Sequence, residues 1–130
     1  PFEDAESADV DFVMVGHISV PNITGDNTPS SLSEKMVTDV LRKDFGYTGL
    51  IITDGMEMKA ITDNYTTEEA TVKAIQAGVD IILKPKDFHA SVAAILKAVE
   101  DGTITEERIN ESVLRIIKKK LRYGSAGNLA

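Results

Sequence analysis

The chain has 130 residues, of which 14 are Lys or Arg and 21 are Asp or Glu, so its formal net charge is −7. A composition of 42% hydrophobic and 27% charged residues is typical of one globular domain, and so acidic a balance argues against broad binding to nucleic acids or anionic membranes, while leaving room for a local basic site. The absence of cysteine excludes disulfides, thiolate catalysis and Cys-based zinc sites but leaves the redox compartment open, and no apolar run approaches the ~18 residues of a membrane-spanning helix.

The first predicted element is a buried strand over residues 12–15, which are continuously apolar, as expected of a strand covered on both faces. Residues 21–30 are rich in Asn, Thr, Gly, Asp and Pro and predict a long surface loop. A helix should then begin at Ser31, because Glu34 follows three residues later with the spacing of a capping box, and it should end at Gly46.

The same alternation continues to the end of the chain. Apolar runs rich in β-branched residues predict strands over residues 50–52 and 79–83. Three further helices are predicted: from Thr66 or Thr67 to Ala77, from 88 to 99, and from the cap Thr105 onwards. A strand–helix unit that repeats three times before a final helix predicts an α/β fold, in which helices cover a parallel sheet.

The candidate functional residues follow the predicted strands, because ligands in such folds bind at the carboxyl ends of the strands. His17 follows the first strand, Asp54 the second and Lys84 the third. Three strands also leave two open sheet edges. The chain is therefore either a very small α/β domain, which can form a homo-oligomer through those edges, or a piece of a larger sheet.

Residues 50–61, LIITDGMEMKAI, resemble the nucleophile segment of family 3 glycoside hydrolases. They are most similar to the bacterial β-N-acetylhexosaminidase branch, in which a strand ends in Thr-Asp or Ser-Asp before a Met-containing turn. Three further stretches agree with the family in order and spacing, namely 11–18, 33–49, and 77–80 followed by 107–116. The resemblance implies three parallel βα units plus a C-terminal helix, resembling the last strands and helices of a (β/α)8 barrel. Residues 1–123 would then be part of a catalytic domain and residues 124–130 a tail or linker.

The resemblance also implies that part of the barrel is missing, since a complete one takes about 250 residues. The family's loop of the Lys-His-Phe-Pro-Gly-His-Gly type lies upstream in the barrel and has no counterpart in this sequence. In the hexosaminidase branch that region supplies a substrate-binding Lys-His pair and a His-Asp dyad that serves as general acid/base. We therefore expect this chain, which begins at Pro1, to be cut from a longer protein and to be inactive alone.

Asp54 is the residue on which the functional interpretation depends. Its position alone favours a cap for the helical turn expected over residues 56–61. The resemblance instead implies that Asp54 is the nucleophile of a retaining glycosidase, which hydrolyses terminal β-linked N-acetylhexosamine or a β-glucoside through a covalent glycosyl–Asp54 intermediate. Gly55 departs from the second acid that is frequent in the branch, which leaves the hydrogen bonding around Asp54 open.

For most residues around Asp54, two explanations remain open. His17 either binds a sugar hydroxyl or is satisfied by the backbone, and Met56 and Met58 either contact the substrate or pack in the core. Lys84 either lines the pocket or pairs with a carboxylate, and Glu57 is expected on a solvated face. The sequence contains no metal-ligand spacing and no Gly-rich phosphate loop, so we expect no cofactor or metal. The resemblance implies a carbohydrate substrate.

Two other classes of function stay open at this point. A receiver-like phosphoacceptor domain would use Asp54 as the acceptor together with Lys84, but the interval between them is one strand–helix unit too short, and the acidic pair expected after the first strand is absent. A non-catalytic module that self-associates through its sheet edges is the other alternative, and it is compatible with a glycosidase fragment.

Overall fold

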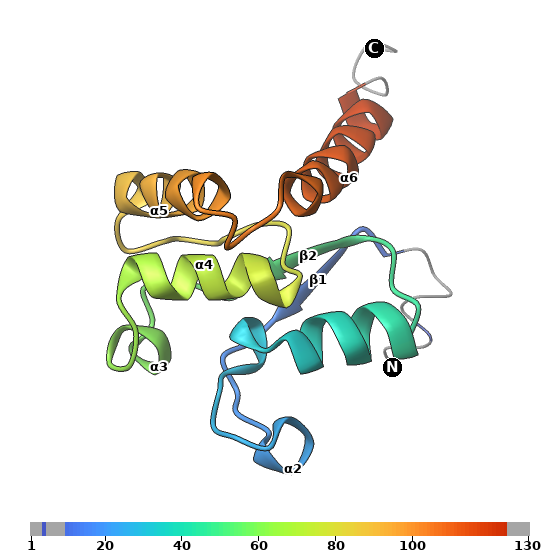
Figure 1. Ribbon diagram of the computed structural model, residues 1–130. Coiled ribbons are helices and arrows are strands. Elements are labelled where there is room, and N and C mark those ends of the chain that lie inside the picture. Colours follow the sequence, from blue (N-terminus) through green and yellow to red (C-terminus); the bar gives the residue numbers. More distant parts are fainter. Residues whose placement is uncertain (1–3, 5–9, 125–130) are drawn as a thin grey trace.

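The computed structural model describes Asp4 and residues 10–124, in which short strands alternate with helices (Figure 1). The elements in chain order are β1 (Phe12–Val15), α2 (Pro21–Thr24), η1 (Ser30–Leu32), η2 (Lys35–Asp44), β2 (Leu50–Thr53), α3 (Lys59–Thr62), α4 (Thr67–Ala77), α5 (Phe88–Glu100) and α6 (Glu106–Gly124). This order confirms the predicted α/β alternation. Residues 21–30, predicted as a loop, include the four-residue helix α2, with Pro21 at its first position.

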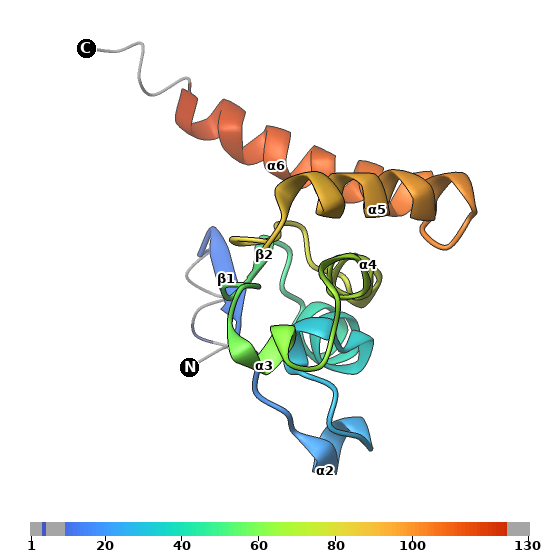
Figure 2. The same ribbon diagram turned by 90° about the vertical axis from the view of Figure 1, so that its left-hand side faces the viewer.

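The two strands run parallel, with Phe12 opposite Leu50 and Val15 opposite Thr53. Opposed residues of parallel strands point to the same face, so the sheet has one face made by Val13, Val15 and their partners and another made by Phe12, Met14 and theirs. The first face packs into the core under the helices, and Figure 2 shows α4 on that one side of the sheet. Phe12 and Met14 on the other face are 50% and 54% exposed, so this face is open along β1, whereas Leu50 on β2 is only 2% exposed.

The third predicted strand, residues 79–83, is present only as a single parallel bridge between Ile52 and Ile81. Side chains take the place of two ladder bonds along this segment. The Ile51 N–H donates to Asp80 Oδ2 at 2.9 Å, and the Leu83 N–H donates to Thr53 Oγ1 at 3.0 Å. Backbone bonds such as Thr53 N–H to Ile81 O, at 3.1 Å, still hold the segment alongside β2. The third βα unit therefore lies parallel, as expected, without a regular strand.

The capping box predicted at Ser31 and Glu34 is wrong, because the Ser31 hydroxyl bonds to His17 instead. Ser31 belongs to the 3₁₀ turn η1, and the following helix η2 begins at Lys35 with no side-chain cap. That helix is wound as a π-helix, and the Phe45 N–H donates to Val40 O, five residues back, at 3.0 Å.

The other predicted helix ends agree with the structure. α4 has a complete capping box, in which the Glu69 N–H donates to Thr66 Oγ1 and the Thr66 N–H donates to the Glu69 carboxylate, and it ends at Gly78, whose φ of 113° is left-handed. The Arg108 N–H donates to Thr105 Oγ1 at the start of α6. α6 extends to Gly124, and the remainder of the predicted tail, 125–130, lies outside the described residues. Within the described part of the chain, no helix has both the length and the apolar character that crossing a membrane requires.

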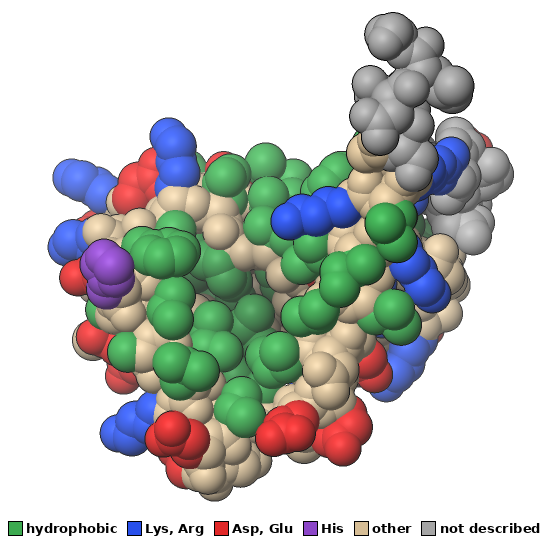
Figure 3. Space-filling model, turned by 90° about the horizontal axis from the view of Figure 1, so that it is seen from above, with side chains coloured by type: hydrophobic (Ala, Val, Ile, Leu, Met, Phe, Trp, Pro, Cys, Tyr) green, Lys and Arg blue, Asp and Glu red, His purple; other side chains and the backbone are tan. Residues whose placement is uncertain are grey.

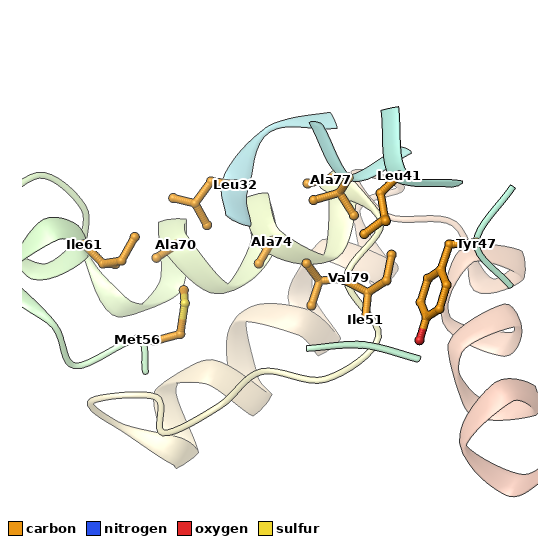
Figure 4. Packing of buried hydrophobic residues seen from close by; sticks show 11 residues of the cluster. Leu32, Leu41, Tyr47, Ile51, Met56, Ile61, Ala70, Ala74, Ala77 and Val79 are labelled. Atoms are coloured by element: carbon orange, nitrogen blue, oxygen red, sulfur yellow. The ribbon is translucent and has the colours of Figure 1, made fainter. Parts of the chain in front are cut away.

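The main core lies between the sheet and the helices η2 and α4 (Figure 4). Ile51 on β2 and Val79 are fully buried at its centre, and Leu41 reaches them from η2. The face that α4 turns to the sheet is made of alanines, which let the helix backbone come close: Ala70, Ala74 and Ala77. A second, smaller cluster of Ile75, Ala98 and Ile104 joins α4 to α5 and the turn that follows it.

The long helix α6 is tied to the starting ends of the strands. The buried Asp80 carboxylate accepts hydrogen bonds from Ser112 Oγ at 2.6 Å and Arg115 Nη1 at 3.1 Å on α6, and from Arg42 Nη2 at 2.5 Å on η2. Lys119 on α6 donates to the Asp11 carboxylate, just before β1. These contacts fix the amino ends of the strands, and the opposite, carboxyl ends carry the candidate site.

Candidate active site

Asp54 is the first residue after β2, and its carboxylate is half-buried at the carboxyl end of the sheet. Its backbone N–H donates to Val15 O at 3.0 Å, which ties it to the end of β1. Its Oδ1 accepts the N–H of Gly55 at 2.7 Å. The following helix α3 begins after Met58 and has no side-chain cap, so the helix-cap explanation of Asp54 is not what the structure shows.

His17 reaches across from the end of β1, and both of its ring nitrogens are occupied. Nε2 lies 3.0 Å from Gly55 O and Nδ1 lies 2.7 Å from Ser31 Oγ. A carbonyl oxygen only accepts, so Nε2 carries the hydrogen, and the neutral ring then accepts the Ser31 hydroxyl hydrogen at Nδ1. Of the two explanations of His17, contact with the backbone is the one observed, and binding of a sugar hydroxyl stays a prediction.

The two methionines after Asp54 lie in different environments. Met56 is only 4% exposed and belongs to the main core, where Figure 4 shows it facing Ala70 and Ile61. Met58 is 45% exposed. The structure thus shows Met56 as a core residue, and it leaves the Met58 side chain accessible. Contact of either residue with a substrate stays a prediction.

Glu57 and Lys84 form an ion pair beside Asp54. Lys84 Nζ lies 3.4 Å from Glu57 Oε1, so Lys84 pairs with a carboxylate, which was one of its two explanations. Glu57 is exposed, as expected, and its carboxylate folds back over Gly55, where an added Cβ would come within 3.0 Å of Glu57 Oε2. Lys84 has a φ of 43°, the left-handed conformation that side chains other than glycine seldom adopt.

Two surface cavities lie next to this end of the sheet. One, of about 560 Å³, has His17 in its wall, and the other, of about 410 Å³, has Met56 in its wall. Asn64 and Tyr65, which follow α3, line both cavities. Sequence reasoning missed these two residues, because they follow no predicted strand and no local pattern distinguishes them from an ordinary loop.

Comparison with known proteins decides the family. The model of the glycosyl hydrolase family 3 N-terminal domain matches residues 1–119. The chain belongs to glycosyl hydrolase family 3. A β-N-acetylglucosaminidase/β-glucosidase of Cellulomonas fimi is 30% identical to it over 132 residues, and a β-hexosaminidase A of Pseudoalteromonas piscicida is 30% identical over 129 residues. The matches cover 95% and 85% of this chain but only 23% and 22% of those proteins.

Solved structures of the family show the same arrangement. The family 3 β-N-acetylglucosaminidase of Paenibacillus sp. str. FPU-7 superposes with a TM-score of 0.90 at 39% identity, over 94% of this chain and 24% of that one. The β-N-acetylglucosaminidase of Thermotoga maritima gives a TM-score of 0.75 at 34% identity, over 82% and 24%. The fold is therefore that of part of a family 3 TIM barrel, and the chain spans about a quarter of the relatives that it matches.

The family match overturns the receiver-like alternative. The contacts agree, because Lys84 pairs with Glu57 and not with Asp54. A receiver domain also needs clustered acids for Mg²⁺, and no group of three or more His, Asp or Glu side chains that could hold a metal ion occurs among the residues that the structure describes.

Proposed function

We propose that this chain forms the nucleophile-bearing part of a retaining β-glycosidase that releases terminal β-linked N-acetylhexosamine, and that Asp54 is the nucleophile. The observation that carries the proposal is the placement of Asp54 at the end of a core strand, with its backbone held by β1 and its carboxylate held by Gly55. The names of the two relatives, a β-N-acetylglucosaminidase/β-glucosidase and a β-hexosaminidase, support this sugar. The β-glucosides are the second substrate class, since the Cellulomonas fimi relative is named for both activities.

The hydrogen bonds of Asp54 suggest which oxygen reacts. Oδ1 accepts the Gly55 N–H, and we propose that the other oxygen, Oδ2, attacks. Its lone pair forms a bond to the anomeric carbon while the glycosidic C–O bond breaks, and a general acid protonates the departing oxygen. The same group, now deprotonated, takes a proton from water, whose oxygen attacks the anomeric carbon; the bond to Asp54 breaks and the carboxylate is regenerated.

The general acid is expected from the rest of the protein. Retaining enzymes that use two carboxyls hold them ~5–5.5 Å apart, and Glu57, the acid nearest to Asp54 in sequence, is engaged with Lys84. We therefore propose that the 130-residue chain alone has no glycosidase activity. Measurable turnover of an aryl β-N-acetylglucosaminide by the purified chain would contradict this.

The experiment that tests the nucleophile uses the full-length protein that carries this chain. Asp54→Asn and Asp54→Ala should lower kcat by about 10³-fold or more, the size of effect seen when a covalent catalyst is lost. Asp44→Asn, at an exposed carboxylate at the end of η2, is the matched control and should keep normal activity. Normal turnover by the Asp54 variants would refute the proposal.

Self-association is a second proposal, which rests on the open surfaces. β1 pairs with β2 on one edge only among the described residues, and its exposed face carries Phe12 and Met14. Figure 3 shows hydrophobic side chains on α5 and α6 that surround a hollow between the two helices. The large exposed hydrophobic residues of these helices are Phe88, Val92, Leu96, Val113, Leu114, Ile117, Leu121 and Tyr123. We expect the isolated chain to form a homodimer through these surfaces. Light scattering after size exclusion tests this, and a monomer at all concentrations would contradict it.

A further inference from the structure

We propose that His17 is a positioning residue for Asp54, and that Ser31 anchors the His17 ring from its other side. The inference rests on the proposed function, because it concerns the geometry of the same nucleophile. It is carried by a continuous series of contacts that runs from Ser31 through His17 and Gly55 to the Asp54 carboxylate. Nothing in the local sequence links these residues, since His17 and Gly55 are 38 positions apart.

The middle of this series is the backbone of Gly55, which is held at both ends. Its N–H donates to Asp54 Oδ1 at 2.7 Å. Its C=O accepts from His17 Nε2 at 3.0 Å and from the Met58 N–H at 3.1 Å. If the Gly55 backbone rotated, its N–H would turn away from Asp54 and the carboxylate would lose the contact that orients it. A donor on Gly55 O therefore restrains the nucleophile through one intervening residue.

Glycine alone would not keep this backbone fixed, because it has no side chain to limit rotation. Gly55 is buried, and the Glu57 carboxylate covers the place where a side chain would stand. The Met58 N–H holds the Gly55 carbonyl from within the turn, and a second restraint comes from outside it. His17 provides it from the end of β1, the strand that also accepts the Asp54 N–H through Val15. The nucleophile and the residue that positions it are thus anchored to the same strand.

The Gly55 carbonyl decides which ring nitrogen carries the hydrogen, because a carbonyl oxygen only accepts. Ser31 supports that form: its side chain is 0% exposed and its Oγ lies 2.7 Å from Nδ1, so its hydroxyl hydrogen is available to that nitrogen. In the neutral ring both bonds fit the Nε2–H form, in which Nε2 donates to Gly55 O. In the other tautomer the lone pair of Nε2 would face the carbonyl oxygen, which is repulsive. With both nitrogens engaged, His17 acts on Asp54 through Gly55 and transfers no proton in the reaction.

Two substitutions of His17 separate its two contacts. The amide nitrogen of His17→Gln reaches about as far as Nε2, so this variant keeps a donor for Gly55 O. The amide of His17→Asn reaches only as far as Nδ1, so it keeps a partner for Ser31 and removes the donor. In the full-length protein we expect His17→Asn to lower kcat by about 10- to 100-fold with KM changed less than about twofold, because both ring nitrogens of His17 are engaged by the protein and its loss acts mainly on the nucleophile. His17→Gln should stay within about fivefold of the wild-type kcat.

A merely structural role of His17 makes a different prediction. Both variants would then lose folded protein to a similar extent, and both would have the wild-type kcat per active site. Active sites are counted by titration with a slow fluorinated glycosyl donor. Ser31→Ala should lower kcat less than His17→Asn does, since it removes the partner of Nδ1 but leaves the ring and its donor to Gly55 O in place. The same donor separates this inference from the proposed function. If Asp54 is labelled but His17→Asn has a normal kcat, the positioning role of His17 is refuted and Asp54 remains the nucleophile. If another residue is labelled, Asp54 is not the nucleophile.

A second measurement needs no variant and so does not depend on whether one folds. In the ¹⁵N spectrum of the imidazole, we expect the hydrogen of the neutral His17 ring on Nε2, with Nδ1 unprotonated and hydrogen-bonded. Observation of the hydrogen on Nδ1 in the neutral ring would overturn the proposal. An equal mixture of the two tautomers would do the same, because it would show that the Nε2 donor to Gly55 O is not fixed.

Discussion

Substitution of Asp80 by Asn should remove a large part of the stability of this chain. The Asp80 side chain is 0% exposed, and its two oxygens accept four hydrogen bonds. They come from Arg42 Nη2, Ser112 Oγ, the Ile51 N–H and Arg115 Nη1, at 2.5, 2.6, 2.9 and 3.1 Å. An asparagine has one oxygen and one NH₂ group, so at least one of these donors would face another donor. The substitution would also leave the guanidinium groups without their counter-charge.

The cost follows from the burial of these charges. Burial lowers the pKa of Arg42 and of Arg108, and the Asp80 charge opposes that shift, so the carboxylate offsets the desolvation of both groups. Removal of one partner of a buried ion pair costs about 3–5 kcal/mol. A domain of this size has a free energy of unfolding of about 5–15 kcal/mol. Asp80→Asn should therefore remove about a fifth of the total or more.

Urea unfolding of the 130-residue chain, followed by circular dichroism, measures this loss. With a slope of about 1–3 kcal/mol per M, the midpoint should fall by about 2 M while the slope stays the same. Asp39→Asn is the matched control, because Asp39 forms exposed pairs with Lys35 and Lys43 that are worth about 0–1 kcal/mol. If Asp80→Asn shifted the midpoint no more than this control, the network would not hold the third βα unit in place.

The remaining predictions concern acid stability, the core and a helix cap. Hydrogen bonds from Lys119 and Tyr123 hold the pKa of Asp11 below its ordinary value of 3.8. The unfolded chain therefore binds more protons near that pH, and the stability from Asp11 is present above about pH 4 and is lost as the pH falls through the lowered value. Urea midpoints measured down this range should fall less steeply for Asp11→Asn than for the wild type, and an equal slope would contradict the pairing. Met56→Ala should cost about 2–5 kcal/mol in the same urea assay, whereas Met58→Ala should stay within about 0.5 kcal/mol; equal losses would show that Met56 does not support the core. Thr66→Ala should cost about 1 kcal/mol through loss of the cap on α4, and an unchanged midpoint would show that the cap is dispensable.

The sequence was most informative where a signal is local. The helix α4 begins after Thr66 and ends at Gly78, within the predicted bounds, because the contacts that fix its ends join residues that are close in sequence. The continuously apolar segment at β2 likewise predicted a buried strand. The same reasoning failed at Ser31, whose spacing to Glu34 is that of a cap. A residue at the end of β1 competes for its hydroxyl, and no local pattern reveals such a competitor.

The prediction of a regular third strand was wrong for a related reason. Residues 79–83 are apolar enough for a strand, but Asp80 and Thr53 use side chains where a ladder would use backbone groups. The candidate site shows the same limit. Asp54 was placed correctly at the end of β2, whereas the contact of His17 with Gly55 joins distant parts of the chain and could only be seen in three dimensions.

Mass spectrometry of a trapped intermediate tests the central claim most directly. The full-length protein would be incubated with a fluorinated N-acetylglucosaminyl fluoride, whose glycosyl–enzyme intermediate hydrolyses slowly, and then digested. The account predicts one added glycosyl group, bound as an ester to Asp54, and no label in Asp54→Asn. A stable label on any other residue, or the absence of a label while substrate is still turned over, would contradict the assignment of Asp54 as the nucleophile.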